Sequence, residues 1–174
     1  MKIILVATAS CLTLLPAAAQ PKSLGASFSF TGLGLTYEHD YEEYKAFVEV
    51  SLKAETSEFI LKRRDFPGMS IGVAWNFIIK EWSSSEGNTL RLFVGPGVTA
   101  GYTADYKSDA GVFFGLKGRV GGECEFSRNI LISLCLLPTI GSHVTMPQGD
   151  LSMKYYKNGL IYSLVPEIGL KYRF

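Results

Sequence analysis

The chain has 174 residues, of which 17 are lysine or arginine, 16 are aspartate or glutamate and 47% are hydrophobic. This length suits one domain, and a formal charge of +1 argues against electrostatic capture of nucleic acid. The basic cluster Lys62-Arg63-Arg64 has no nucleic-acid motif beside it, and we interpret it as a solvated loop.

The first 19 residues have the composition of a secretory signal peptide. Lys2 precedes an apolar run from Ile3 to Leu15, and Ala17-Ala18-Ala19 supplies the small residues of a cleavage site. We therefore divide the chain into a signal peptide (1–19) and one exported domain (20–174). Within that domain no apolar run reaches the roughly 18 to 20 residues that a membrane-spanning helix needs.

The exported domain consists of stretches in which apolar and polar residues alternate, with turn-forming residues between them. Such alternation is typical of β-strands, and no stretch shows a sustained helical period. Asn158-Gly159 lies between two alternating stretches, and this dipeptide favours a tight hairpin turn. The pattern predicts an all-β domain with eight antiparallel strands, at 24–38, 44–55, 70–80, 90–103, 110–126, 130–142, 151–156 and 160–174.

Each predicted strand has an apolar face and a polar face. In the last strand Leu170, Tyr172 and Phe174 share one face, while Lys171 and Arg173 lie on the other. Such strands form either a soluble barrel with its apolar face inward or a membrane barrel with its apolar face outward. The soluble alternative is a secreted or periplasmic, lipocalin-like barrel that binds an apolar ligand.

Two features favour the membrane barrel. Many apolar stripes have the about 9 to 11 residues of a tilted spanning strand. Aromatic residues stand at the stripe ends, where an interfacial girdle lies in such proteins; they are Tyr44, Trp82, Tyr102, Phe126, Tyr162 and Phe174. We therefore predict an antiparallel up-and-down transmembrane β-barrel. Its lumen would hold a network of charges comprising Glu49, Lys53, Arg91, Lys117, Arg119, Glu123, Glu125, Glu167 and Lys171.

The chain ends with a glycine, alternating apolar residues and a phenylalanine, at Gly169, Leu170, Tyr172 and Phe174. This ending resembles the C-terminal assembly signal of bacterial outer-membrane barrels. The mature chain resembles small barrels of the OmpA/OmpX-like class and barrel proteins of the Bacteroidetes type. The resemblance implies an outer-membrane location, contact with outer-membrane lipid and insertion by the barrel assembly machinery. With eight strands, both termini would be periplasmic and residues 39–43 would face outside, although the connections do not sort cleanly into long loops and short turns.

The narrow interior of an eight-stranded barrel is filled by side chains, which argues against an open pore. We expect the lumen charges to pair with one another, because an unpaired buried charge is costly; an ion or proton path is the alternative. The expected role is structural, or an interaction with a surface partner through segments 56–69 and 143–159, whose apolar side chains lie among charges.

A lipid A-modifying enzyme is a further alternative, but it needs a serine, a histidine and an acidic partner in contact. The chain has only His39 and His143, and Ser142 precedes His143 directly, which places their side chains on opposite faces of a strand. We therefore expect no catalytic site. Cys124 and Cys135 fall on opposite faces of neighbouring strands and should remain free thiols. We expect no metal or other cofactor.

Overall fold

A computed structural model describes residues 21–56, 60, 68–84, 87–105, 109–126, 129–146 and 150–174. The predicted signal peptide, the basic cluster at 62–64, Phe59 and Phe66 lie outside these residues. The strands are β1 (Lys22–Ser29), β2 (Gly32–Tyr41), β3 (Ala46–Glu55), β4 (Gly68–Ser83), β5 (Thr89–Ala104), β6 (Ala110–Phe126), β7 (Ile130–Leu136), β8 (Thr139–Thr145), β9 (Ser152–Tyr155) and β10 (Glu167–Arg173). The described residues also form the 3-10 helix η1 (Glu42–Tyr44) and the α-helix α3 (Lys157–Ile161). In the part of the chain described, no helix is long and apolar enough to cross a membrane.

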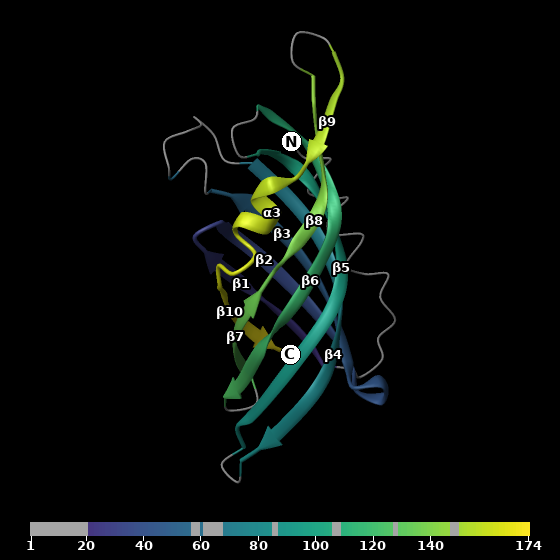
Figure 1. Ribbon diagram of the computed structural model, residues 1–174. Coiled ribbons are helices and arrows are strands. Elements are labelled where there is room, and N and C mark those ends of the chain that lie inside the picture. The colour runs from purple at the N-terminus through teal and green to yellow at the C-terminus, as the bar shows by residue number, and fades with distance from the viewer. Residues whose placement is uncertain are drawn as a thin grey trace, which may run out of the picture.

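The strands form one closed antiparallel sheet (Figure 1). Its order is β5-β4-β3-β2-β1-β10-β7-β6-β8-β9, and the pairing of β5 with β6 closes it into a barrel. β7 and β8 follow one another along β6 and form one wall strand, interrupted at Leu137 and Pro138. β9 and β10 form the next wall strand, interrupted by α3. The barrel therefore has eight wall strands, which confirms the predicted fold class.

The predicted strand boundaries were wrong at both ends of the chain. The first predicted strand, 24–38, is two strands, β1 and β2. The chain turns at Thr31, whose N–H donates to the Ser29 hydroxyl at 3.2 Å. The last two predicted strands, 151–156 and 160–174, belong to one wall strand, and Asn158-Gly159 lies within α3 rather than in a hairpin turn. These two errors cancel, so the predicted number of eight agrees with the structure.

The helix α3 is held in the wall by contacts that local sequence alone does not show. The carboxylate of Asp105, just after β5, accepts from the N–H groups of Lys157 at 3.0 Å and Asn158 at 2.8 Å. These are free donors of a first helical turn, which normally need such a cap. At Gly159 a Cβ would lie 2.4 Å from the Thr139 carbonyl oxygen, so only glycine allows this approach to β8.

The two ends of the barrel differ in their connections. Lys22 and Phe174 are hydrogen-bonded to each other at one end, which we call the terminal end; the opposite end is the loop end. The strand ends that flank 42–45, 84–88 and 127–129 lie at the terminal end, while those that flank 30–31, 56–67, 105–109 and 146–151 lie at the loop end. The longer connections thus gather at the loop end, more clearly than the sequence indicated.

Residues 39–43 lie at the terminal end and not opposite the termini as predicted. Asp40 donates its N–H to the Pro21 carbonyl oxygen at 3.0 Å, and His39 pairs with Lys22. The prediction failed because β1 and β2 were taken as one strand, which reversed the direction assigned to the chain after Gly32.

The apolar faces of the strands point outward. Leu116 is 70% exposed and Leu170 is 59% exposed, whereas charged residues on the opposite faces are buried. Aromatic residues are exposed near both ends of the wall, with Tyr102 toward the loop end and Tyr44, Trp82, Phe126 and Phe174 toward the terminal end. The lipocalin-like alternative needed the reverse orientation, with apolar side chains inside, and the structure contradicts it.

Two details adjust the predicted faces. A β-bulge between Ile78 and Lys80 shifts the register, so Lys80 lies beside Trp82 outside the barrel rather than on the polar face. At the barrel closure Gly25 pairs with Lys171, and a Cβ at position 25 would lie 2.2 Å from the Leu170 carbonyl oxygen. The bulge changes which side chains of β4 face outward, and Gly25 allows the close approach of β1 and β10.

Candidate functional site

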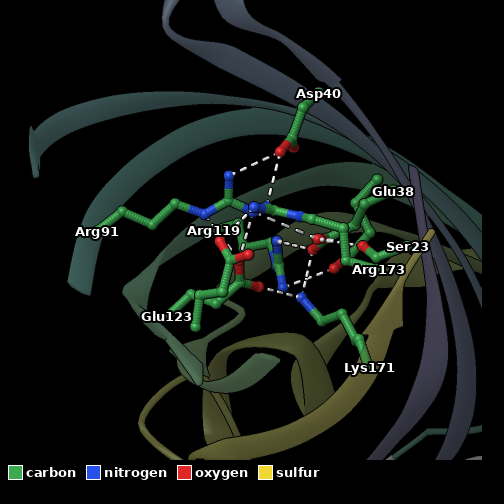
Figure 2. Close-up of polar contacts among 10 residues, drawn as sticks. Ser23, Glu38, Asp40, Arg91, Arg119, Glu123, Lys171 and Arg173 are labelled. Atoms are coloured by element: carbon green, nitrogen blue, oxygen red, sulfur yellow. Dashed lines mark hydrogen bonds and ion pairs between the residues drawn. The ribbon is translucent and has the colours of Figure 1, made fainter. Parts of the chain in front are cut away.

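The inward-facing residues of the terminal half form a buried cluster of charges, which we call the lumen network (Figure 2). Its members come from six of the eight wall strands and meet across the lumen. The lumen network comprises Ser23, Glu38, Asp40, Glu49, Arg91, Arg119, Glu123, Glu125, Lys171 and Arg173. Because strand side chains alternate between faces, each of these residues lies on the face opposite the apolar stripe of its strand.

Glu38 and Glu123 join opposite sides of the lumen through one lysine. The ammonium of Lys171 donates to Glu38 and to Glu123, the second contact being 2.6 Å long. Glu38 also accepts from the Ser23 hydroxyl at 3.1 Å. Since Glu38 comes from β2 and Glu123 from β6, this bridge connects walls that are not neighbours in the sheet.

Arg91 and Arg173 meet at one aspartate nearer the terminal end. Arg91 donates to Asp40 at 3.0 Å and, through Nε, to Glu123 at 2.7 Å. Arg173 donates to the same Asp40 oxygen at 2.8 Å and also pairs with Glu125. Each arginine thus engages at least two carboxylates, which fixes its side chain in the lumen.

Arg119 lies at the centre of the lumen, between a carboxylate and aromatic rings. Its Nη2 is 2.6 Å from Glu49, and its guanidinium carbon is 4.7 Å from the Phe93 ring centroid. Phe93 and Phe47 pack edge to face at 5.2 Å, and Arg91 lies over Phe47. These two phenylalanines point into the lumen and fill space between the charged groups.

The loop half of the lumen contains fewer charges and more hydroxyl groups. Lys53 pairs with Glu167 at 2.5 Å, and Lys117 donates to the Ser51 hydroxyl at 3.1 Å. A cavity of about 70 Å³ lies here, bounded on one side by Tyr156 and α3. The charged residues predicted for the lumen are therefore divided between the lumen network and this loop half; those in the loop half are Lys53, Lys117 and Glu167.

Sequence reasoning missed several members of the lumen network. Glu38 and Asp40 were overlooked because the predicted first strand ended at Glu38. A break at Thr31-Gly32 would have shown Thr36, Glu38 and Asp40 on one face of a second strand. Phe47 and Phe93 gave no such signal, since an aromatic residue on a polar face has no counterpart in the alternation.

The residues of the predicted assembly signal lie in or beside β10. Leu170, Tyr172 and Phe174 point outward and are exposed, while Gly169 faces the lumen beside Ser133. β10 pairs with both β1 and β7, so this last strand closes the hydrogen-bonded ring at the terminal end.

Neither histidine takes part in a catalytic arrangement among the residues described. The Nε2 atom of His143 is 2.9 Å from the Thr103 carbonyl oxygen, and the His39 ring packs against Tyr41. No serine hydroxyl is hydrogen-bonded to either ring in these parts of the chain. Cys124 and Cys135 are free cysteines, and no group of metal-binding side chains is found within the described ranges.

An apolar outer surface around a buried, ion-paired interior is the arrangement of a protein whose solvent is lipid. With its closed antiparallel sheet and the exposed aromatic residues near both ends, it defines the class of this protein as a small transmembrane β-barrel. No family model and no curated protein sequence matches the chain.

Solved structures that are similar to the chain over most of its length include the following two. A major outer membrane protein from Thermus thermophilus is 13% identical with a TM-score of 0.46, and the alignment covers 90% of this chain and 100% of that chain. Neisserial surface protein A is 10% identical with a TM-score of 0.37, covering 88% of this chain and 91% of that chain.

Proposed function

We propose that the protein is an integral outer-membrane barrel with a structural or surface-interaction role, whose lumen is closed by its own side chains. The lumen network carries this proposal. It crosses the barrel from β2 and β10 to β5 and β6, and Arg119, Glu123 and Lys171 within it are at most 2% exposed. A diffusion pore would need an open path at this level.

The free-energy cost of separating the buried ion pairs supports a closed lumen. An eight-stranded barrel is just wide enough to be filled by side chains. A passing ion would have to displace Lys171 from its two carboxylates or Arg119 from Glu49, and separating a buried pair costs about 3–5 kcal/mol. Phe47 and Phe93 pack against each other inside the lumen and fill space beside the charges.

Conductance across a planar lipid bilayer tests closure. We expect the folded barrel to show no steady conductance, and the triple variant Arg91→Ser, Glu123→Ser, Lys171→Ser to show open-channel steps. The variant Leu116→Ser, which changes only the outer face, serves as the control and should remain closed. Heat-modifiable migration on a gel shows that each variant is folded. Steady conductance of the unmodified barrel would contradict a closed lumen.

A surface interaction is the second candidate, and the β8–β9 hairpin favours it. Met146, Leu151 and Met153 lie at the loop end with exposures of 72%, 68% and 61%. Of the predicted interaction segment 143–159, however, His143, Tyr156 and Asn158 are buried inside the barrel and cannot contact a partner. We expect serine at the three exposed positions to reduce cross-linking to a specific surface partner in intact cells without altering folding. Unchanged cross-linking would favour the purely structural role.

Assembly through the barrel assembly machinery is proposed from the same structure. β10 presents Leu170, Tyr172 and Phe174 outward on the strand that closes the ring. Cell fractionation should show that Phe174→Ser lowers the amount recovered in the outer membrane, whereas Leu164→Ser, an exposed residue outside β10, leaves it unchanged. Equal recovery of both variants would remove the role of Phe174 in assembly.

A further inference from the structure

Lys117 differs from the other buried cations of the lumen. It is only 8% exposed, yet its ammonium has one hydrogen-bond partner, the Ser51 hydroxyl, and no carboxylate within ion-pair distance among the described residues. By contrast, Lys53, Arg91, Arg119, Lys171 and Arg173 each lie beside at least one carboxylate. An ammonium has three donors and is costly to bury without a counter-charge. Lys117 therefore has capacity for an anion.

The wall beside Lys117 leaves room for that ammonium. A Cβ at Gly72 would lie 2.9 Å from Lys117 Nζ and 3.1 Å from the Ser51 hydroxyl. Any other residue at position 72 would crowd the ammonium and its hydroxyl partner. Both Lys117 and Gly72 line the cavity of about 70 Å³ in the loop half. The cavity therefore has room for a small polar group beside the ammonium.

The same cavity also offers acceptors. The side-chain oxygen of Asn158 has no hydrogen-bond partner within the described ranges, although Asn158 is 4% exposed. The carboxylate of Glu55 lines the cavity and accepts from Ser70 at 2.7 Å, while Glu167 is neutralised by Lys53. A ligand that fits must therefore accept from Lys117 and donate to Asn158 or Glu55.

We propose that this cavity binds a phosphate group that carries one negative charge and retains an acidic hydrogen. Its ionised oxygens accept from Lys117, and its P–OH group donates to the amide oxygen of Asn158 or to Glu55. Phosphate is a compact group, as a cavity of this volume requires. Sulfate has the same size and shape but carries no hydrogen near neutral pH, so it cannot make the second contact and meets Glu55 as a like charge.

Two sources could supply this phosphate group: a free phosphate ion in solution or the headgroup of a lipid. The cavity is separated from the outside of the wall by the segment 156–166, which interrupts the wall strand between β9 and β10, and Leu160, Ile161 and Leu164 on that segment are exposed. A free phosphate ion and the headgroup of a phosphate monoester lipid offer the same chemistry to Lys117.

Phosphate titration of the folded full barrel in detergent tests the site. At mildly acidic pH, where inorganic phosphate is mainly singly charged, calorimetry should show saturable binding of one phosphate per barrel and much weaker binding of sulfate. Lys117→Met should weaken phosphate binding about ten- to a hundredfold, the usual effect of losing a hydrogen bond to a charged group. Lys154→Met, at an exposed lysine of β9, is the matched control and should bind as the unmodified barrel does.

A second variant and a measurement in lipid nanodiscs complete the test. If Lys117→Met does not fold, Gly72→Ala places a methyl group beside the ammonium and should weaken binding in its place. In nanodiscs that contain phosphatidic acid, loss of phosphate binding identifies the lipid headgroup as the ligand, and unchanged binding identifies the free ion. The proposal is overturned if phosphate does not saturate the folded barrel, if sulfate binds equally well, or if the folded variants at Lys117 or Gly72 bind phosphate normally. Conductance measures closure separately, so failure here leaves the closed lumen standing.

Discussion

Arg119 and Glu49 form an ion pair at the centre of the barrel, 2.6 Å apart and both at most 2% exposed. The guanidinium of Arg119 also lies over the rings of Phe47 and Phe93. The pair is therefore sensitive to the loss of one partner, because the remaining charge is left buried.

We expect Arg119→Met to lower the free energy of unfolding by about 3–5 kcal/mol. The double variant Arg119→Met, Glu49→Leu should regain most of that loss, since no uncompensated charge remains. Urea titration of the barrel in lipid vesicles measures both. Equal destabilisation by the single and double variants would contradict the importance of the pair.

Because the apolar stripes face outward, the stability cost of a charged substitution should depend on its depth in the membrane. Val120 lies in the middle of the stripe of β6, and Phe126 lies at its end. Arginine should cost about 2–4 kcal/mol at Val120 and about 0–1 kcal/mol at Phe126, because the cost of a charge falls toward the membrane surface. Vesicle unfolding measures the difference. Similar costs at the two positions would mean that the stripe does not span a bilayer.

Removing the cap that Asp105 supplies to α3 should lower the stability of the barrel by less than removing Arg119. Asp105→Ala leaves two helical N–H groups without their acceptor and should lower stability by about 0.5–2 kcal/mol. Asp150→Ala, at an exposed aspartate of the loop end, should change stability by less than about 0.5 kcal/mol. Proteolysis within segment 156–166 should rise for Asp105→Ala alone. No rise would show that the contacts of Tyr156 and Gly159 hold α3 without the cap.

The close approach of β1 and β10 predicts that Gly25→Ala is harmful. The added methyl group would meet the Leu170 carbonyl oxygen at 2.2 Å and Lys171 Cα at 2.5 Å, so the backbone must shift. We expect a loss of about 1–3 kcal/mol and slower appearance of the heat-modifiable form. Gly122→Ala is the control, because its nearest neighbour is the flexible side chain of Leu92 at 3.2 Å. Equal refolding rates of the two variants would contradict this account.

The fold class could be predicted because alternation gives each strand an apolar and a polar face, and the length of the apolar stripes and their aromatic ends favour lipid on the apolar face. Val112, Phe114 and Leu116 of β6 predicted an apolar outer face, and the structure places them there. Breaks within that pattern were harder to recognise. The turn at Thr31 is only two residues long, and its signal is a change of parity, because the exposed apolar positions are even-numbered up to Phe30 and odd-numbered from Leu33.

The interruption at α3 could not be predicted from local sequence. Asn158-Gly159 normally favours a hairpin, but here Gly159 serves a close contact with Thr139, and Asp105 stabilises the helix from a distant part of the chain. The sequence predicted many of the charged residues that face the lumen, but it did not predict which of them form pairs. The partner of Lys171 depends on barrel closure, which brings β2 and β6 to the same lysine.

The break in the wall gives the two halves of the barrel different local stabilities. At the terminal end, hydrogen bonds run around the whole ring through β1, β10 and β7. Toward the loop end, no strand pairing among the described residues joins β9 to β1, and side-chain contacts such as Phe30 with Tyr162 close the gap instead. Amide groups of the ring at the terminal end should therefore exchange with solvent only on global unfolding, whereas those of segment 156–166 exchange through a subglobal opening. Segment 156–166 should therefore open locally while the strands of the terminal end stay paired.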